Sequence, residues 1–132
     1  MNSFTIQSTA RTSFINMDEK IAEVLLSEGI KDGVVTIFVP HTTAGVTINE
    51  NADPDVLADM TKVLDDLIPW KNNYRHFEGN TAAHVKASMM GSSVQVMVED
   101  GRLKLGRWQS VFFCEFDGPR MRTVWIKGDT TK

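Results

Sequence analysis

Three histidines lie in polar stretches or at the ends of predicted elements, and they are the most informative candidates for a functional site. His41 follows a proline at the end of an apolar run, His76 lies in a polar stretch, and His84 lies in a predicted helix. Neutral imidazole is a common zinc ligand. The spacing fits no compact zinc pattern such as H-E-x-x-H. The histidines therefore either converge on a divalent ion or each hydrogen-bonds a backbone carbonyl at an element end.

Two polar side chains extend this candidate site. Glu50 and His41 flank the segment 42–49, and Asn80 precedes His84 by four residues. A separation of four places two side chains on one face of a helix. A carboxylate beside these imidazoles would suit magnesium, whereas imidazoles alone would suit zinc.

Charged residues gather where a later apolar run stops. Glu115, Asp117 and Arg120 surround the Gly118-Pro119 turn. Arginine binds phosphate through two parallel hydrogen bonds, and Arg122 or Lys86 would add positive charge. The alternative is a solvated turn with a surface ion pair.

Several function classes are excluded or disfavoured. The chain carries 14 Lys and Arg against 17 Asp and Glu, a formal net charge of −3, which gives no general attraction to nucleic acid or an anionic membrane. Serines 92 and 93 follow Gly91 and could contact an oxyanion, but no glycine-rich phosphate loop and no G-x-S-x-G motif is present. The single cysteine, Cys114, lies in an apolar run and is interpreted as a small buried residue. No apolar window approaches a membrane span, and no targeting segment is visible, so we expect a cytoplasmic protein.

Hydrophobic periodicity predicts the helices and strands that carry these residues. The chain of 132 residues fits a single compact domain over 1–132. Asp18 is predicted to be the N-cap of one helix, and Asp53 is predicted to be the N-cap of another, with Pro54 at its first position. Asp100-Gly101 is a predicted hairpin turn. Helices are predicted over 18–28, 54–67 and 80–90, strands over 3–9, 34–39, 46–49, 93–98, 103–105, 108–115 and 122–126, and a loose tail over 129–132. Strands grouped around two or three helices predict an α+β fold with mostly antiparallel sheets.

Separated motifs together resemble the YjbQ family. The segment 41–51, HTTAGVTINEN, is followed by His76, by Gly79-Asn80 and by His84, and the segment 115–120, EFDGPR, resembles the closing motif of the family. Further matches lie between them: Ser93, Val96, Val98, Gly101, Gly106, Trp108-Gln109 and Val111. The resemblance covers about Phe4 to Lys127. One departure is Arg107, where the family commonly has a small threonine.

The resemblance implies a compact α+β homotrimer with polar residues near the subunit boundaries. It also implies a secondary thiamine-phosphate synthase, which joins an aminopyrimidine methyl diphosphate to a thiazole phosphate and releases diphosphate. We expect no nucleic-acid or membrane partner. The alternatives are a metal-dependent hydrolase of a small phosphorylated metabolite and a trimer that binds such a metabolite without turnover.

The residues are assigned to three roles under this hypothesis. Catalysis is assigned to His41, Glu50, His84 and Asp117. Binding of the phosphorylated substrate is assigned to Thr42, Thr43, Asn80, Lys86, Ser93 and Arg120. A divalent metal, magnesium or zinc, is assigned to His41, His76 and His84.

Overall fold

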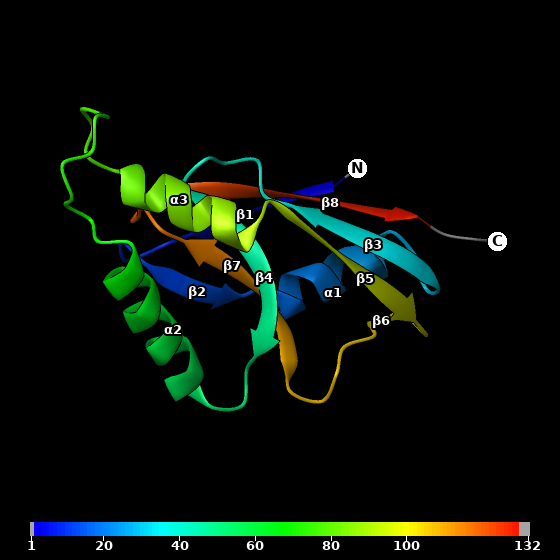
Figure 1. Cartoon of the computed structure of the whole chain (residues 1–132). Helices are drawn as coiled ribbons and strands as arrows, with labels where there is room; N and C mark the ends of the chain where they lie inside the picture. The colour runs from blue at the N-terminus through cyan, green and yellow to red at the C-terminus, as the bar shows by residue number, and fades with distance from the viewer. Residues whose placement is uncertain (1, 130–132) are drawn as a thin grey trace.

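The computed structural model describes residues 2–129, which form an α+β domain with entirely antiparallel strand pairing (Figure 1). The predicted fold class is therefore confirmed. The helices are α1 (Asp18–Ser27), α2 (Pro54–Leu67) and α3 (Thr81–Met90). The strands are β1 (Asn2–Gln7), β2 (Ser13–Asn16), β3 (Gly33–Phe38), β4 (Ala44–Glu50), β5 (Ser93–Glu99), β6 (Arg102–Leu103), β7 (Gln109–Glu115) and β8 (Met121–Asp129).

Two sheets pack face to face around the main core. One sheet has the order β1-β8-β3-β5-β6 and the other has the order β2-β7-β4. Alternate residues of β3 and β8 point inward, and they meet Val46 of β4 and Phe113 of β7. Ile21 and Leu25 of α1 complete this core.

The opposite face of the smaller sheet carries α3, which contacts β4 and β7. Ala83 and Ala87 of this helix pack with Cys114 and Phe116 in a second apolar cluster. Because alanine is small, the helix backbone can approach the sheet closely. Cys114 is buried as predicted, and burial raises the pKa of its thiol to about 12, so it is not a reactive nucleophile.

Helix α2 begins as the sequence predicts. The side chain of Asp53 accepts a hydrogen bond from the backbone N–H of Asp55, and Pro54 occupies the first turn. Leu64 is the only buried residue of α2, while Val63 and Leu67 are largely exposed. This helix therefore buries only one side chain of its apolar face and leaves part of that face exposed.

Three local predictions differ from the structure. The short strand β2 was not predicted, because four residues are too few for a periodic signal. Asp18 is the first residue of α1 rather than its cap: its carboxylate accepts a hydrogen bond from the backbone N–H of Val111, and Asn16 accepts one from the N–H of Asp18. The predicted loose tail begins at Asp129, which is the last residue of β8, and the remainder of that tail lies outside the described residues.

No helix within residues 2–129 is long and apolar enough to cross a membrane.

Candidate functional site

A polar cavity of about 310 Å³ lies where the end of the β3–β4 connection meets α3 and the start of β5. It is lined by His41, Thr42, Ala44, His84, Ala87, Ser88 and Ser92. Two of the three predicted histidines therefore line one cavity, although 43 residues separate them in the sequence.

Gly45 explains how α3 comes this close to β4. A Cβ atom at Gly45 would lie 2.6 Å from the backbone oxygen of Gly91, at the end of α3. That oxygen accepts a hydrogen bond from the N–H of Val46. Any larger residue at position 45 would push the helix away, and it would separate His84 from His41.

The His41 ring is fixed by the backbone of β8. Its Nε2 accepts a hydrogen bond from the N–H of Thr123 over 2.9 Å. Burial lowers the pKa of His41 most, and the positive charge of Arg122 lowers it further. His41 is consequently a neutral imidazole at physiological pH.

A fully buried ion pair supports this side of the cavity. Arg122 donates from Nε and Nη2 to Glu115 over 2.8 and 2.5 Å, and Ser8 donates to the same carboxylate over 2.7 Å. Arg122 Nη2 also donates to Thr43 Oγ1 over 2.8 Å. Burial alone would raise the pKa of Glu115, but the hydrogen bonds and charge of its partners outweigh burial and lower that pKa.

A second polar cluster lies at the start of α3. Asn80 Nδ2 donates to Asp117 Oδ2 over 2.9 Å, and Arg120 Nη2 donates to that same oxygen over 3.2 Å. The Oδ1 atom of Asn80 is buried and has no hydrogen-bond partner among the described residues. Asn80 occupies the N-cap position of α3 without a capping hydrogen bond from its side chain, and His84 lies one turn further along the helix.

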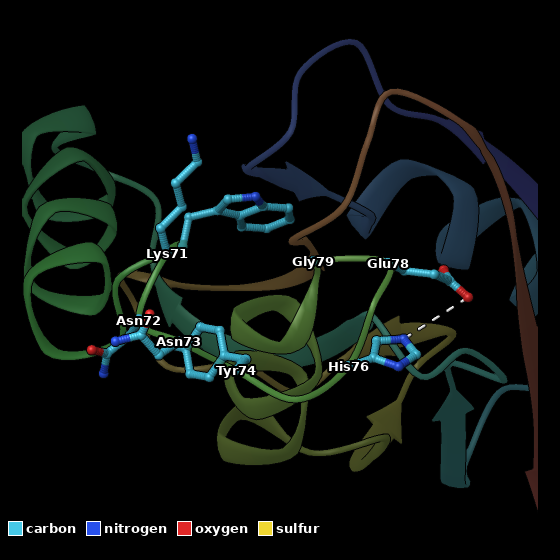
Figure 2. A pocket seen from close by; sticks show the side chains of 8 residues that line it. Lys71, Asn72, Asn73, Tyr74, His76, Glu78 and Gly79 are labelled. Carbon is cyan, nitrogen blue, oxygen red and sulfur yellow. Dashed lines mark ion pairs between the residues drawn. The ribbon is translucent and has the colours of Figure 1, made fainter.

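His76 lies beside His84 but outside the cavity lining. The two ring centroids are 5.7 Å apart, edge to face. Figure 2 shows His76 on the loop after α2, in a second hollow of about 300 Å³, with its ring turned toward Glu78. The His76 Nε2 and Glu78 Oε1 atoms are 3.9 Å apart.

The three histidines do not form a complete metal site within residues 2–129. No group of three or more His, Cys, Asp or Glu side chains in this range is arranged to hold a metal ion. The Nε2 atom of His41 already accepts the Thr123 N–H, which leaves only His76 and His84 as an adjacent pair. The divalent metal, magnesium or zinc, stays a prediction.

Three other predicted site residues lie elsewhere in the chain. Glu50 is at the far end of β4, opposite Gln109, whereas the cavity is at the Ala44 end, about 20 Å away at the usual rise of a strand. Lys86 is buried and ion-paired with Asp65 of α2, so it joins two helices instead of facing the cavity. Ser93 is paired with Phe38 in the larger sheet, and its neighbour Ser92 lines the cavity.

Sequence reasoning gave no role to Ser8, and it treated Glu115 and Arg122 only as surface groups or donors. A signal for their burial was present in the alternation of the strands. Arg122 shares its strand face with Val124 and Ile126, and both of those residues are buried. An arginine on an apolar strand face requires a buried carboxylate partner, and Glu115 ends the neighbouring apolar run.

Comparisons with known proteins match almost the whole chain to one family. The family described as "UPF0047 protein YjbQ-like" matches residues 2–129. The UPF0047 protein YugU of Bacillus subtilis is 51% identical over 128 residues, covering 96% of this chain and 97% of that protein. The UPF0047 protein of Methanocaldococcus jannaschii is 44% identical over 124 residues, covering 94% of this chain and 90% of that protein.

Solved structures extend the agreement to three dimensions. An uncharacterized conserved protein of the same family from Clostridium acetobutylicum superposes with a TM-score of 0.95 at 46% identity, covering 98% of this chain and 100% of that one. A conserved hypothetical protein from Thermus thermophilus superposes with a TM-score of 0.91 at 41% identity, covering 97% of this chain and 99% of that one. None of these descriptions assigns an activity. The chain belongs to the YjbQ/UPF0047 family.

Proposed function

We propose that the cavity between His41 and His84 binds the phosphate groups of a small phosphorylated metabolite. One observation carries this proposal. The side chains that line the cavity offer imidazoles and hydroxyls, and none of the described lining residues has a carboxylate. Such a lining can donate several hydrogen bonds to an oxyanion without opposing its charge.

The reaction proposed for this cavity is displacement of diphosphate. The nitrogen of a thiazole phosphate attacks the methylene carbon of an aminopyrimidine methyl diphosphate, the new C–N bond forms, and the C–O bond breaks with its electron pair on diphosphate. The difficult part is charge developing on the leaving group. Hydrogen bonds from His84, Thr42 and Ser92 would stabilise that charge.

The cluster at the start of α3 supplies the second part of the site. Arg120 is exposed, and its guanidinium is oriented by Asp117. It acts on the same region as His41, because its positive charge contributes to lowering the pKa of that histidine. We assign Arg120 to the phosphate of the second substrate and Asp117 to positioning Arg120.

The hydrolase alternative has less support from the geometry. A zinc-activated water needs about three protein ligands, and only His76 and His84 are adjacent within the described residues. Metal content of the purified protein distinguishes the two reactions. Tightly held stoichiometric zinc favours hydrolysis.

The assembly proposed is a homotrimer, and a group of exposed apolar side chains on one sheet face supports it. The outward face of the larger sheet exposes Val34, Phe38, Met97, Met121 and Trp125. The Phe38 and Trp125 rings stack at 5.7 Å between centroids. An uncovered apolar sheet face of this kind favours association. Sedimentation velocity should give the trimer mass, and it should give a lower mass for Trp125→Asp.

Two neighbouring serines provide a matched test of the binding site. Titration calorimetry with inorganic pyrophosphate should show weaker binding for Ser92→Ala by about 3- to 10-fold, the loss of one hydrogen bond. Ser93→Ala removes the same hydroxyl one residue away, outside the lining, and should bind as the original chain does. Formation of thiamine phosphate from the two substrates is then measured in the same three proteins. Equal pyrophosphate affinity in all three proteins would remove the basis of the proposal.

A further inference from the structure

We infer that His41 presents an Nδ1–H donor to the cavity and serves as an oxyanion-binding residue, not as a metal ligand or a general base. This inference deepens the proposed function and rests on it for the identity of the ligand. It assigns His41 a single protonation form and a single direction of hydrogen bonding.

The hydrogen bond from β8 determines which ring nitrogen carries the proton. A backbone N–H can only donate, so the Nε2 atom that faces Thr123 must offer its lone pair. In a neutral imidazole the single proton is then on Nδ1. His41 is one of the residues that line the cavity, and we infer that its Nδ1–H faces the space a ligand would occupy.

The sheet register explains why the backbone N–H of Thr123 needs the histidine as its acceptor. Strand β3 pairs with β8 as far as Phe38, which is opposite Trp125. Continuing that register by two residues would place Pro40 opposite Thr123, but β3 has already ended. The His41 ring therefore accepts the hydrogen bond that a longer strand would have accepted, and a rotation of the ring would leave a half-buried N–H unsatisfied.

The surrounding charges keep the ring neutral. Arg122 and Arg120 both disfavour a second proton on His41, and burial does so more strongly. Glu115 acts in the opposite direction, but its carboxylate is shared among Arg122, Ser8 and the N–H of Asp117. A neutral ring donates a hydrogen bond from Nδ1 without placing a positive charge in the cavity. The ligand can therefore leave without breaking an ion pair with His41.

This arrangement is incompatible with metal ligation by His41. A metal on Nε2 would displace the Thr123 N–H, and a metal on Nδ1 would require that atom to lose its proton while Nε2 still accepts a hydrogen bond. Donation to an anion needs neither change. The cavity of donors around His41 has the matching chemistry.

Nuclear magnetic resonance of the ligand-free protein tests the tautomer directly. Two-bond ¹H–¹⁵N correlations of the His41 ring at about pH 7.5, above the ordinary imidazole pKa, should show a protonated Nδ1 and an unprotonated Nε2. A protonated Nε2, or a doubly protonated ring, would overturn the inference. Because no ligand is present, this result is independent of the proposed function.

Two isosteric substitutions test the donor. The amide nitrogen of His41→Asn occupies the place of Nδ1 and keeps a donor to the cavity, whereas the amide of His41→Gln reaches the place of Nε2 and keeps only the contact with Thr123. The affinity of the asparagine variant for inorganic pyrophosphate should be within about 3-fold of that of the unsubstituted protein. The affinity of the glutamine variant should be lower by about 10-fold or more. The reverse order, or an equal loss in both, contradicts donation from Nδ1. If the original chain binds no pyrophosphate while the predicted tautomer is observed, the proposed function fails and the assignment of the proton stands.

Discussion

The two sides of the candidate site are built differently. On the sheet side, His41 and Thr43 are held by β8 and by the buried Glu115–Arg122 pair. On the loop side, His76 is exposed, and its neighbour Phe77 is 94% exposed. The sheet side is preorganised before any ligand arrives, whereas the loop side can adjust when a ligand or a neighbouring subunit covers it.

This difference is one of energy as well as geometry. The carboxylate of Glu115 and the guanidinium of Arg122 are removed from water, so each depends on the other. The ion pair between Glu99 and Lys104 is exposed on both sides, and its partners are solvated whether or not they meet. Perturbing the buried pair should therefore have the larger effect.

The largest expected effect follows from Glu115→Gln. This substitution keeps the shape of the side chain but leaves the charge of Arg122 buried without a counter-ion. The free energy of unfolding should fall by about 3–5 kcal/mol, as measured by urea denaturation at a fixed protein concentration. Glu99→Gln is the control, and it should change the midpoint very little. A small loss for Glu115→Gln would mean that water reaches Arg122, and the sheet side would then not be preorganised.

The next effect is a dependence of stability on pH in two windows. The pKa of His41 is lowered from its ordinary 6.5, so the unfolded chain takes up a proton first, and stability falls as the pH drops below that value. The pKa of Glu115 is lowered from 4.5; its contribution is complete above that pH and is lost as the pH falls through the folded-state pKa. Both groups act in the same direction.

Urea denaturation between about pH 8 and about pH 2 measures these two contributions. His41→Asn should remove the loss of stability that begins below pH 6.5. Glu115→Gln should remove the loss of stability that begins below pH 4.5. A profile of His41→Asn that is parallel to the original between about pH 7 and about pH 5 would show that this ring is not held neutral by the fold.

Much of the pattern of helices, strands and turns could be predicted from the sequence. Periodicity and turn residues are local signals, so α2, α3 and the Asp100-Gly101 turn were predicted correctly. The convergence of His41 and His84 was a hypothesis from separate motifs, and the structure places both on one cavity. Glu50 was included for its proximity in sequence, but an extended strand carries it away from the cavity.

The sheet side could not be predicted in the same way because it depends on register. The contact between Thr123 and His41 exists only because β3 ends two residues before the position opposite Thr123, and no local pattern gives that offset. Lys86 was interpreted as a phosphate ligand from its charge alone. Its true partner, Asp65, is on another helix and is paired with it only through the packing of α2 beside α3.

The smallest expected effect on stability comes from His76→Ala. The side chain is exposed and has no close hydrogen bond within the described residues, since its nearest acidic partner is 3.9 Å away. The free energy of unfolding should change by less than about 0.5 kcal/mol. Affinity for pyrophosphate is the informative measurement. A loss of affinity without a loss of stability would show that the loop side closes over the ligand next to His84, whereas unchanged affinity would confine binding to the sheet side and His84.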